Sequence, residues 1–155
     1  MTAAIAAVLV KLAIPVFTSD GRKTKASTEV AAIFGELAAK EEQYKADRGS
    51  YLAASACPST TSPTGTSAAS CVASGKPWAL MNVALPYTTL ACSYTISVGL
   101  SSTTPTVPTG FSFTAPPESW YFITATCETD GQAGKSSSYF TASNDTSIQE
   151  LNAGY

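Results

Sequence analysis

The chain has 155 residues, a length that suits one domain with a core of ordinary size. Charged residues make up 13% of it, about half the share usual in a soluble domain, and 9 basic residues face 11 acidic ones. This balance argues against a nucleic-acid-binding protein that works by neutralising phosphates. The basic cluster Arg22, Lys23 and Lys25 fits equally well a charged flank at a membrane surface and the solvated start of a helix.

The chain opens with an apolar run, AAIAAVLVKLAIPVF, at Ala3–Phe17. As a helix it would span about 22 Å, short of the roughly 30 Å hydrocarbon layer of a membrane, and Lys11 lies inside it. It is therefore a poor membrane span by itself. Because apolar residues encircle the helix, they must be buried against something. We interpret residues 1–25 as a hydrophobic assembly helix. Its assembly residues are Ile5, Val8, Leu9, Val10, Leu12, Ile14, Pro15, Val16 and Phe17.

Pro15 interrupts this helical pattern. A proline inside a helix lacks the N–H that would bond to the preceding turn, and its ring clashes with that turn. We therefore expect the helix to kink or open around Lys11–Ile14.

Residues 26–52 predict an amphipathic helix that packs on the rest of the chain. Apolar residues recur there at three- and four-residue steps and form one stripe. The stripe consists of Val30, Ile33, Phe34, Leu37 and Tyr44. Glu29, Glu36 and Gln43 step by seven on another face. The helix should end near Asp47, with Gly49 as its stop.

Residues 53–155 predict a globular β head. It opens with a Ser/Thr-rich surface loop over residues 53–76, which shows no periodicity. Strands are predicted at Cys92–Leu100, Ser119–Thr129 and Ser137–Ala142, with a crossing loop at Thr103–Pro117 and a turn at Asp130–Lys135. On the first strand, Tyr94, Ile96, Val98 and Leu100 share one face. The fold class is therefore α+β, with a long N-terminal helix on a small antiparallel sheet.

Four cysteines, Cys57, Cys71, Cys92 and Cys127, all lie in the head. An even number of cysteines in a chain of this composition predicts two disulfides and an oxidising compartment. Three pairings are possible. We favour Cys57–Cys71, which closes a local loop, and Cys92–Cys127, which joins two strands.

The sequence contains no catalytic constellation, and we expect no enzyme activity and no cofactor. The chain has no histidine, which removes Ser-His and Cys-His pairs, and the cysteine spacing does not suit zinc. Glu128 and Asp130 flank a turn and would offer calcium too few oxygens, so an ordinary turn is the better interpretation and no metal site is expected.

The chain resembles type IV pilins and pseudopilins. The segment AIPVF at Ala13–Phe17, followed by a helix that ends in YKADRGSYLA at Tyr44–Ala53, is similar to the N-terminal helix of these proteins. The tail from Ser119 to Ile148 is similar to their last strands. The resemblance covers most of the chain. It implies a ladle fold, with one long helix on an about four-stranded antiparallel sheet, and a filament centred on the N-terminal helices.

The chain departs from the family pattern at its start. Pilins are cut after a glycine, and the mature chain carries a glutamate near the start of its hydrophobic segment. Here Met1-Thr2 precedes the apolar run, and no acidic residue occurs before Asp20. We expect either a true N-terminus upstream of Met1 or a subunit that lacks this glutamate.

The resemblance implies a structural subunit of an extracellular, pilus-like bacterial filament, of the kind used in adhesion and motility. The expected partners are copies of itself, the inner membrane before assembly and the pilus assembly machinery, with no nucleic acid. One alternative is a minor pilin or a type II secretion pseudopilin. Another, from a different class, is a monomeric membrane-anchored adhesin or binding domain, against which the short run with Lys11 argues.

Overall fold

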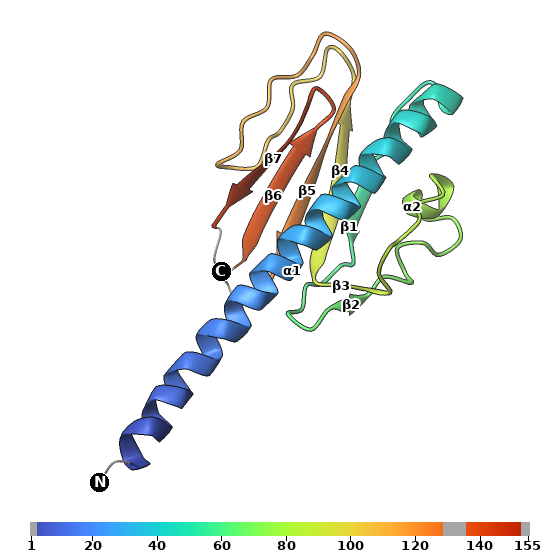
Figure 1. Ribbon diagram of the computed structural model, residues 1–155. Helices are drawn as coiled ribbons and strands as arrows, with labels where there is room; N and C mark the ends of the chain where they lie inside the picture. The colour runs from blue at the N-terminus through green and yellow to red at the C-terminus, as the bar shows by residue number, and fades with distance from the viewer. Residues whose placement is uncertain (1–2, 129–135, 153–155) are drawn as a thin grey trace.

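The computed structural model describes residues 3–128 and 136–152, with side chains from Gly21 onward, and shows an α+β fold. One long helix, α1 (Ala3–Arg48), crosses the face of an antiparallel sheet with its C-terminal half (Figure 1). Its N-terminal half extends beyond the sheet, so the N-terminus lies far from the head (Figure 1). A short helix, α2 (Pro77–Leu80), lies on the other side of α1 from β6 and β7.

The main sheet has five antiparallel strands in the order β1-β4-β5-β6-β7. Their bounds are Ala54–Cys57 for β1, Cys92–Gly99 for β4, Trp120–Cys127 for β5, Ser137–Ala142 for β6 and Asp145–Leu151 for β7. A second sheet pairs β2 (Thr66–Ser67) with β3 (Thr89–Leu90). The three strands predicted from sequence are β4, β5 and β6, and they form the middle of the main sheet.

The edges of the sheet differ from the expectation. The segment 53–76 is not only a loop, because it contains β1 and β2, and β7 adds a strand at the opposite edge. Leu100 lies beyond the end of β4 and is 64% exposed, so it does not join Tyr94 and Ile96 on the buried face. The predicted turn Asp130–Lys135 lies outside the described residues.

The inner face of the sheet packs on α1. Val30, Ile33 and Leu37 are fully buried, and Phe34 makes an edge-to-face contact with Tyr94 on β4 at 6.1 Å between ring centroids. Tyr44 is partly buried against the same cluster. Full burial of each aliphatic side chain stabilises the fold by about 2 kcal/mol, so this seam holds the helix to the head.

The helix is continuous from Ala3 to Arg48, and the expected opening around Lys11–Ile14 is not found. Pro15 removes one backbone donor, but its neighbours on both sides keep helical geometry, so the loss stays confined to that turn. The C-terminal end follows the sequence pattern. Gly49 takes a positive φ of 83°, and its N–H donates to the carbonyl of Lys45 at 2.7 Å, which closes the last turn.

The outer face of the sheet is covered by the loop that joins β4 to β5. Phe111 stacks on Phe140 of β6 at 5.2 Å between centroids, and Phe113 makes edge contacts with Trp120 and Phe122 of β5. The amide of Gln149 on β7 holds the loop by accepting from the N–H of Ser112 at 2.9 Å and donating to its carbonyl at 2.8 Å. Strand β5 is therefore buried on both faces from Trp120 to Ile123, whereas Thr126 near its end is exposed.

The cysteines pair as the sequence analysis favours, Cys57 with Cys71 and Cys92 with Cys127. Cys92 and Cys127 stand directly opposite each other on β4 and β5 and are fully buried, with 4.1 Å between their Cα atoms. The Cys57–Cys71 bridge joins β1 to the chain that leads toward α2.

The two disulfides should differ in their effect on stability. Replacing Cys92 and Cys127 by alanine removes a link across 35 residues inside the core, whereas the other pair closes only 14. By chain entropy alone, a disulfide that closes a loop of about 15 residues stabilises the fold by about 3 kcal/mol, and one that closes the longer loop by slightly more. Loss of Cys92 and Cys127 also leaves a cavity in the core, which adds to the destabilisation of that variant. Denaturant unfolding should show the larger loss for the Cys92/Cys127 variant. The reverse order would contradict the argument.

Candidate functional site

The predicted assembly residues, from Ile5 to Phe17, lie on the part of α1 that extends beyond the head. Their side chains are outside the described set. Arg22 and Lys25 are exposed where α1 leaves the sheet, and Ala26 is the first buried residue among the described side chains of the helix. Among the residues described, no helix is long and apolar enough to cross a membrane.

The helix is attached to the head by a buried carboxylate as well as by its apolar stripe. Glu29 is 3% exposed. Its Oε1 accepts from the N–H of Cys92 at 3.1 Å and from the hydroxyl of Tyr94 at 2.9 Å, and its Oε2 accepts from the N–H of Ala91 at 2.9 Å. Three donors from Ala91 and the start of β4 thus converge on one side chain of α1, which satisfies a carboxylate that would otherwise be costly to bury.

A second carboxylate of the same face holds the segment before β3. Glu36 Oε1 accepts from the N–H of Ala84 at 2.8 Å. The two glutamates are seven residues apart, two helical turns, so they bind the segment 84–92 at two points about 10 Å apart along α1. The helix cannot slide or rotate against the head without breaking these bonds.

A third carboxylate, Glu41, is fully buried near the end of α1. Its Oε2 accepts from the N–H of Leu52 at 2.9 Å, whereas Oε1 has no hydrogen-bond partner among the described residues. Burial raises the pKa of Glu41 from 4.5 to about 7. The electrostatic interaction with nearby Glu42 also raises this pKa, and the backbone hydrogen bond from Leu52 lowers it only in part. Protonation removes the cost of burying the charge, so Glu41 favours the neutral form below neutral pH.

Sequence reasoning placed neither Glu29 nor Glu41 in the core. The periodicity contains the evidence for both. Glu41 fills the gap between Leu37 and Tyr44 in the apolar stripe, and Glu29 lies four residues before Ile33. The step of seven that links Glu29 to Glu36 marks the face that accepts backbone N–H groups. A carboxylate on such a stripe is ordinarily assigned to solvent, because its partners come from distant segments.

The described residues contain no group of three or more His, Cys, Asp or Glu side chains that could hold a metal ion. Glu128 ends the described segment after β5, and Asp130 lies outside the described residues. Around Glu29, Glu36 and Glu41, the helix and the head interact by hydrogen bonding and apolar packing.

Comparison with protein-family profiles finds no match to this chain, and comparisons with curated proteins and with solved structures find none either.

Glu29→Ala should destabilise the head strongly, because it leaves three donors without their acceptor. Buried unpaired groups cost about 1–3 kcal/mol each, so we expect a loss of at least about 3 kcal/mol in the free energy of unfolding. Glu36→Ala is the matched control: it removes one bond at a partly exposed site and should cost about 1 kcal/mol. Denaturant unfolding measures both. Equal losses in the two variants would show that Glu29 does not anchor the helix.

Glu41 should make the protein less stable as the pH rises from about 4.5 to 7. The pKa is raised in the folded state, so the folded chain holds a proton that the unfolded chain has released in this window. The shift corresponds to about 3 kcal/mol lost across the window. Glu41→Gln removes this dependence, whereas Glu36→Gln retains it. Thermal unfolding at pH 4, 6 and 8 compares the variants, and parallel profiles for wild type and Glu41→Gln would contradict the assignment.

Proposed function

We propose that this protein is a structural subunit of an extracellular, type IV pilus-like filament, in which the N-terminal half of α1 packs against copies of itself. The observation that carries the proposal is the length of α1 relative to the head. Ala26 is the first buried residue among the described side chains of α1, and residues 3–25, which precede it, span about 35 Å as a continuous helix.

The sequence of the protruding helix supports burial against other helices. Ala3–Phe17 is apolar on all sides apart from Lys11. At about 25 cal/mol per Å² of apolar surface, leaving such a segment in water is costly, and packing several copies together removes that cost. A single copy in a bilayer would instead have to accommodate Lys11. We infer that the inner membrane holds the subunit before assembly and that the assembled filament is its final environment.

The attachment of α1 to the head supports a role in an ordered assembly. Helix and sheet share the core around Ile33 and Leu37, and Glu29 and Glu36 fix the position of the helix along the head. Copies that associate through their N-terminal helices would therefore present their heads in one orientation. Two disulfides would stabilise those heads outside the cell. The same arrangement serves a major subunit, a minor pilin or a pseudopilin.

Deleting residues 1–21 should convert the protein from a filament-forming chain into a soluble monomer with an intact head. The reason is that the deletion removes the apolar segment and leaves every described core residue in place. Size-exclusion chromatography and negative-stain electron microscopy of the two chains provide the measurement, with circular dichroism as the check on folding.

A point variant sharpens the test in the full chain. Leu9→Asp places a charge in the proposed interface and should abolish filaments, whereas Leu9→Ile keeps the apolar surface and should retain them. Filaments formed by the truncated chain, or by Leu9→Asp as readily as by Leu9→Ile, would refute assembly through this helix. A full chain that stays monomeric in membranes would favour an anchored binding domain.

A further inference from the structure

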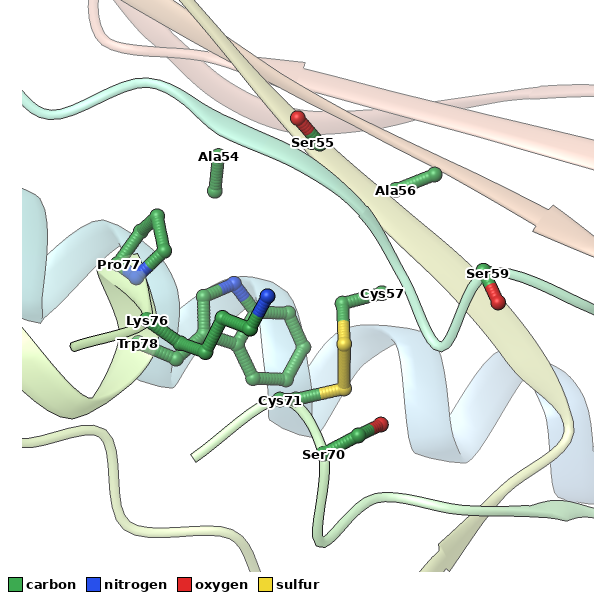
Figure 2. A pocket seen from close by; sticks show the side chains of 10 residues that line it. All are labelled: Ala54, Ser55, Ala56, Cys57, Ser59, Ser70, Cys71, Lys76, Pro77 and Trp78. Carbon is green, nitrogen blue, oxygen red and sulfur yellow. A yellow bond between two sulfur atoms is a disulfide. The ribbon is translucent and has the colours of Figure 1, made fainter. Parts of the chain in front are cut away.

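A pocket of about 290 Å³ lies between the edge strand β1 and the start of α2, away from the proposed assembly helix. One wall is β1 itself, and the other is formed by the chain around Cys71 and by residues 76–78 (Figure 2). The Cys57–Cys71 disulfide bridges the two walls. The opening is therefore held by a covalent link, and little of its shape has to be ordered when a ligand enters.

The pocket contains a buried hydrogen-bond donor that has no partner in the described part of the chain. Trp78 is 1% exposed, and its Nε1–H has no acceptor among the described residues. Figure 2 shows the indole at the floor of the pocket, with its nitrogen edge turned toward Ala54. A buried N–H without a partner is costly, and native proteins seldom retain one without a reason.

Lys76 adds the only charge among the residues that line this pocket. Its side chain is exposed, and it forms no ion pair or side-chain hydrogen bond with the described part of the chain. The head has few positive charges: between residues 53 and 155 the basic residues are Lys76 and Lys135. Ser55, Ser59 and Ser70 contribute hydroxyls to the rim. None of the described residues that line the pocket is acidic.

We propose that this pocket binds a small molecule that carries a carboxylate and is about the size of a monosaccharide or a single amino acid. The carboxylate would accept hydrogen bonds from the ammonium group of Lys76 and from the indole N–H of Trp78. Hydrogen bonds to an ionised carboxylate are stronger than those between neutral groups. The long, exposed side chain of Lys76 can move to admit a ligand to the indole edge. The apolar wall of Ala54 and the disulfide suits the body of the ligand, and the serines suit its hydroxyl or amide groups.

The volume limits the ligand. Pockets for drug-sized molecules range from about 300 to 1,000 Å³, so this one suits a compact ligand. The carboxylate could belong to a sugar acid or to an amino-acid derivative. Two probes distinguish these sources: D-glucuronate with D-glucose as its neutral counterpart, and N-acetylalanine with N-acetylalaninamide. Each pair differs in a single carboxylate.

The experiment is an NMR titration of the full chain, kept in detergent micelles, with the two indole N–H resonances as the readout. Trp78→Phe assigns the Trp78 resonance by its loss. Trp120 supplies an internal reference, because its Nε1 is also buried without a partner in the described part of the chain but belongs to the cluster on the outer face of the sheet. We expect at least one carboxylate probe to shift the Trp78 resonance in a saturable manner and leave that of Trp120 in place.

Variants decide whether the carboxylate is recognised as proposed. Lys76→Gln should weaken binding at least tenfold, and Lys40→Gln, a matched change on α1 outside the pocket, should leave it unchanged. Response to one probe pair alone identifies the source of the carboxylate and supports the proposal. The proposal is overturned if neither carboxylate probe binds, if the neutral counterparts bind equally well, or if Lys76→Gln binds like the wild type. None of these outcomes depends on filament formation.

Discussion

The buried bonds of Glu29 determine how the long helix sits on the head. Apolar contacts between α1 and the sheet supply most of the binding energy, but they tolerate small slides because one methyl group packs much like another. The three donors from Ala91, Cys92 and Tyr94 have no such tolerance, since a shift of one helical turn, 5.4 Å, would leave all of them unpaired. The carboxylate thus fixes a position that the apolar stripe only favours.

The same site couples the helix to the covalent core of the sheet. Cys92 donates its N–H to Glu29 and is bonded through its side chain to Cys127 on β5. Cys92 therefore connects the helix to both β4 and β5. On the opposite face, aromatic side chains of the crossing loop pack on β5 and β6, and Gln149 holds that loop at Ser112. The first half of β5 is enclosed between the two layers, which agrees with its continuous apolar sequence, WYFI.

The elements with strong periodicity could be predicted from the sequence, and the elements without it could not. The amphipathic half of α1, the strands β4 to β6 and the favoured cysteine pairing all follow from local pattern and spacing. The edge strands β1 and β7 consist largely of small and polar residues with exposed side chains, so their pairing depends on neighbours brought by the fold. Helical spacing places Glu29 and Glu41 beside the apolar stripe, but it does not reveal their hydrogen-bond partners, which lie 11 to 65 residues away.

The continuity of α1 through Pro15 bears directly on the proposed assembly. In an unbroken helix, the orientation set at Glu29 is carried along the backbone hydrogen bonds to the segment that would pack against other copies. Pro15 lacks the N–H that would bond to Lys11, so the helix is weakest at that turn, within the part of the apolar segment that is nearest the head. A filament built on this chain would therefore be stiff within each head and within the part of α1 between Pro15 and the head. Its bending would concentrate at Pro15, where a missing backbone bond costs least to deform.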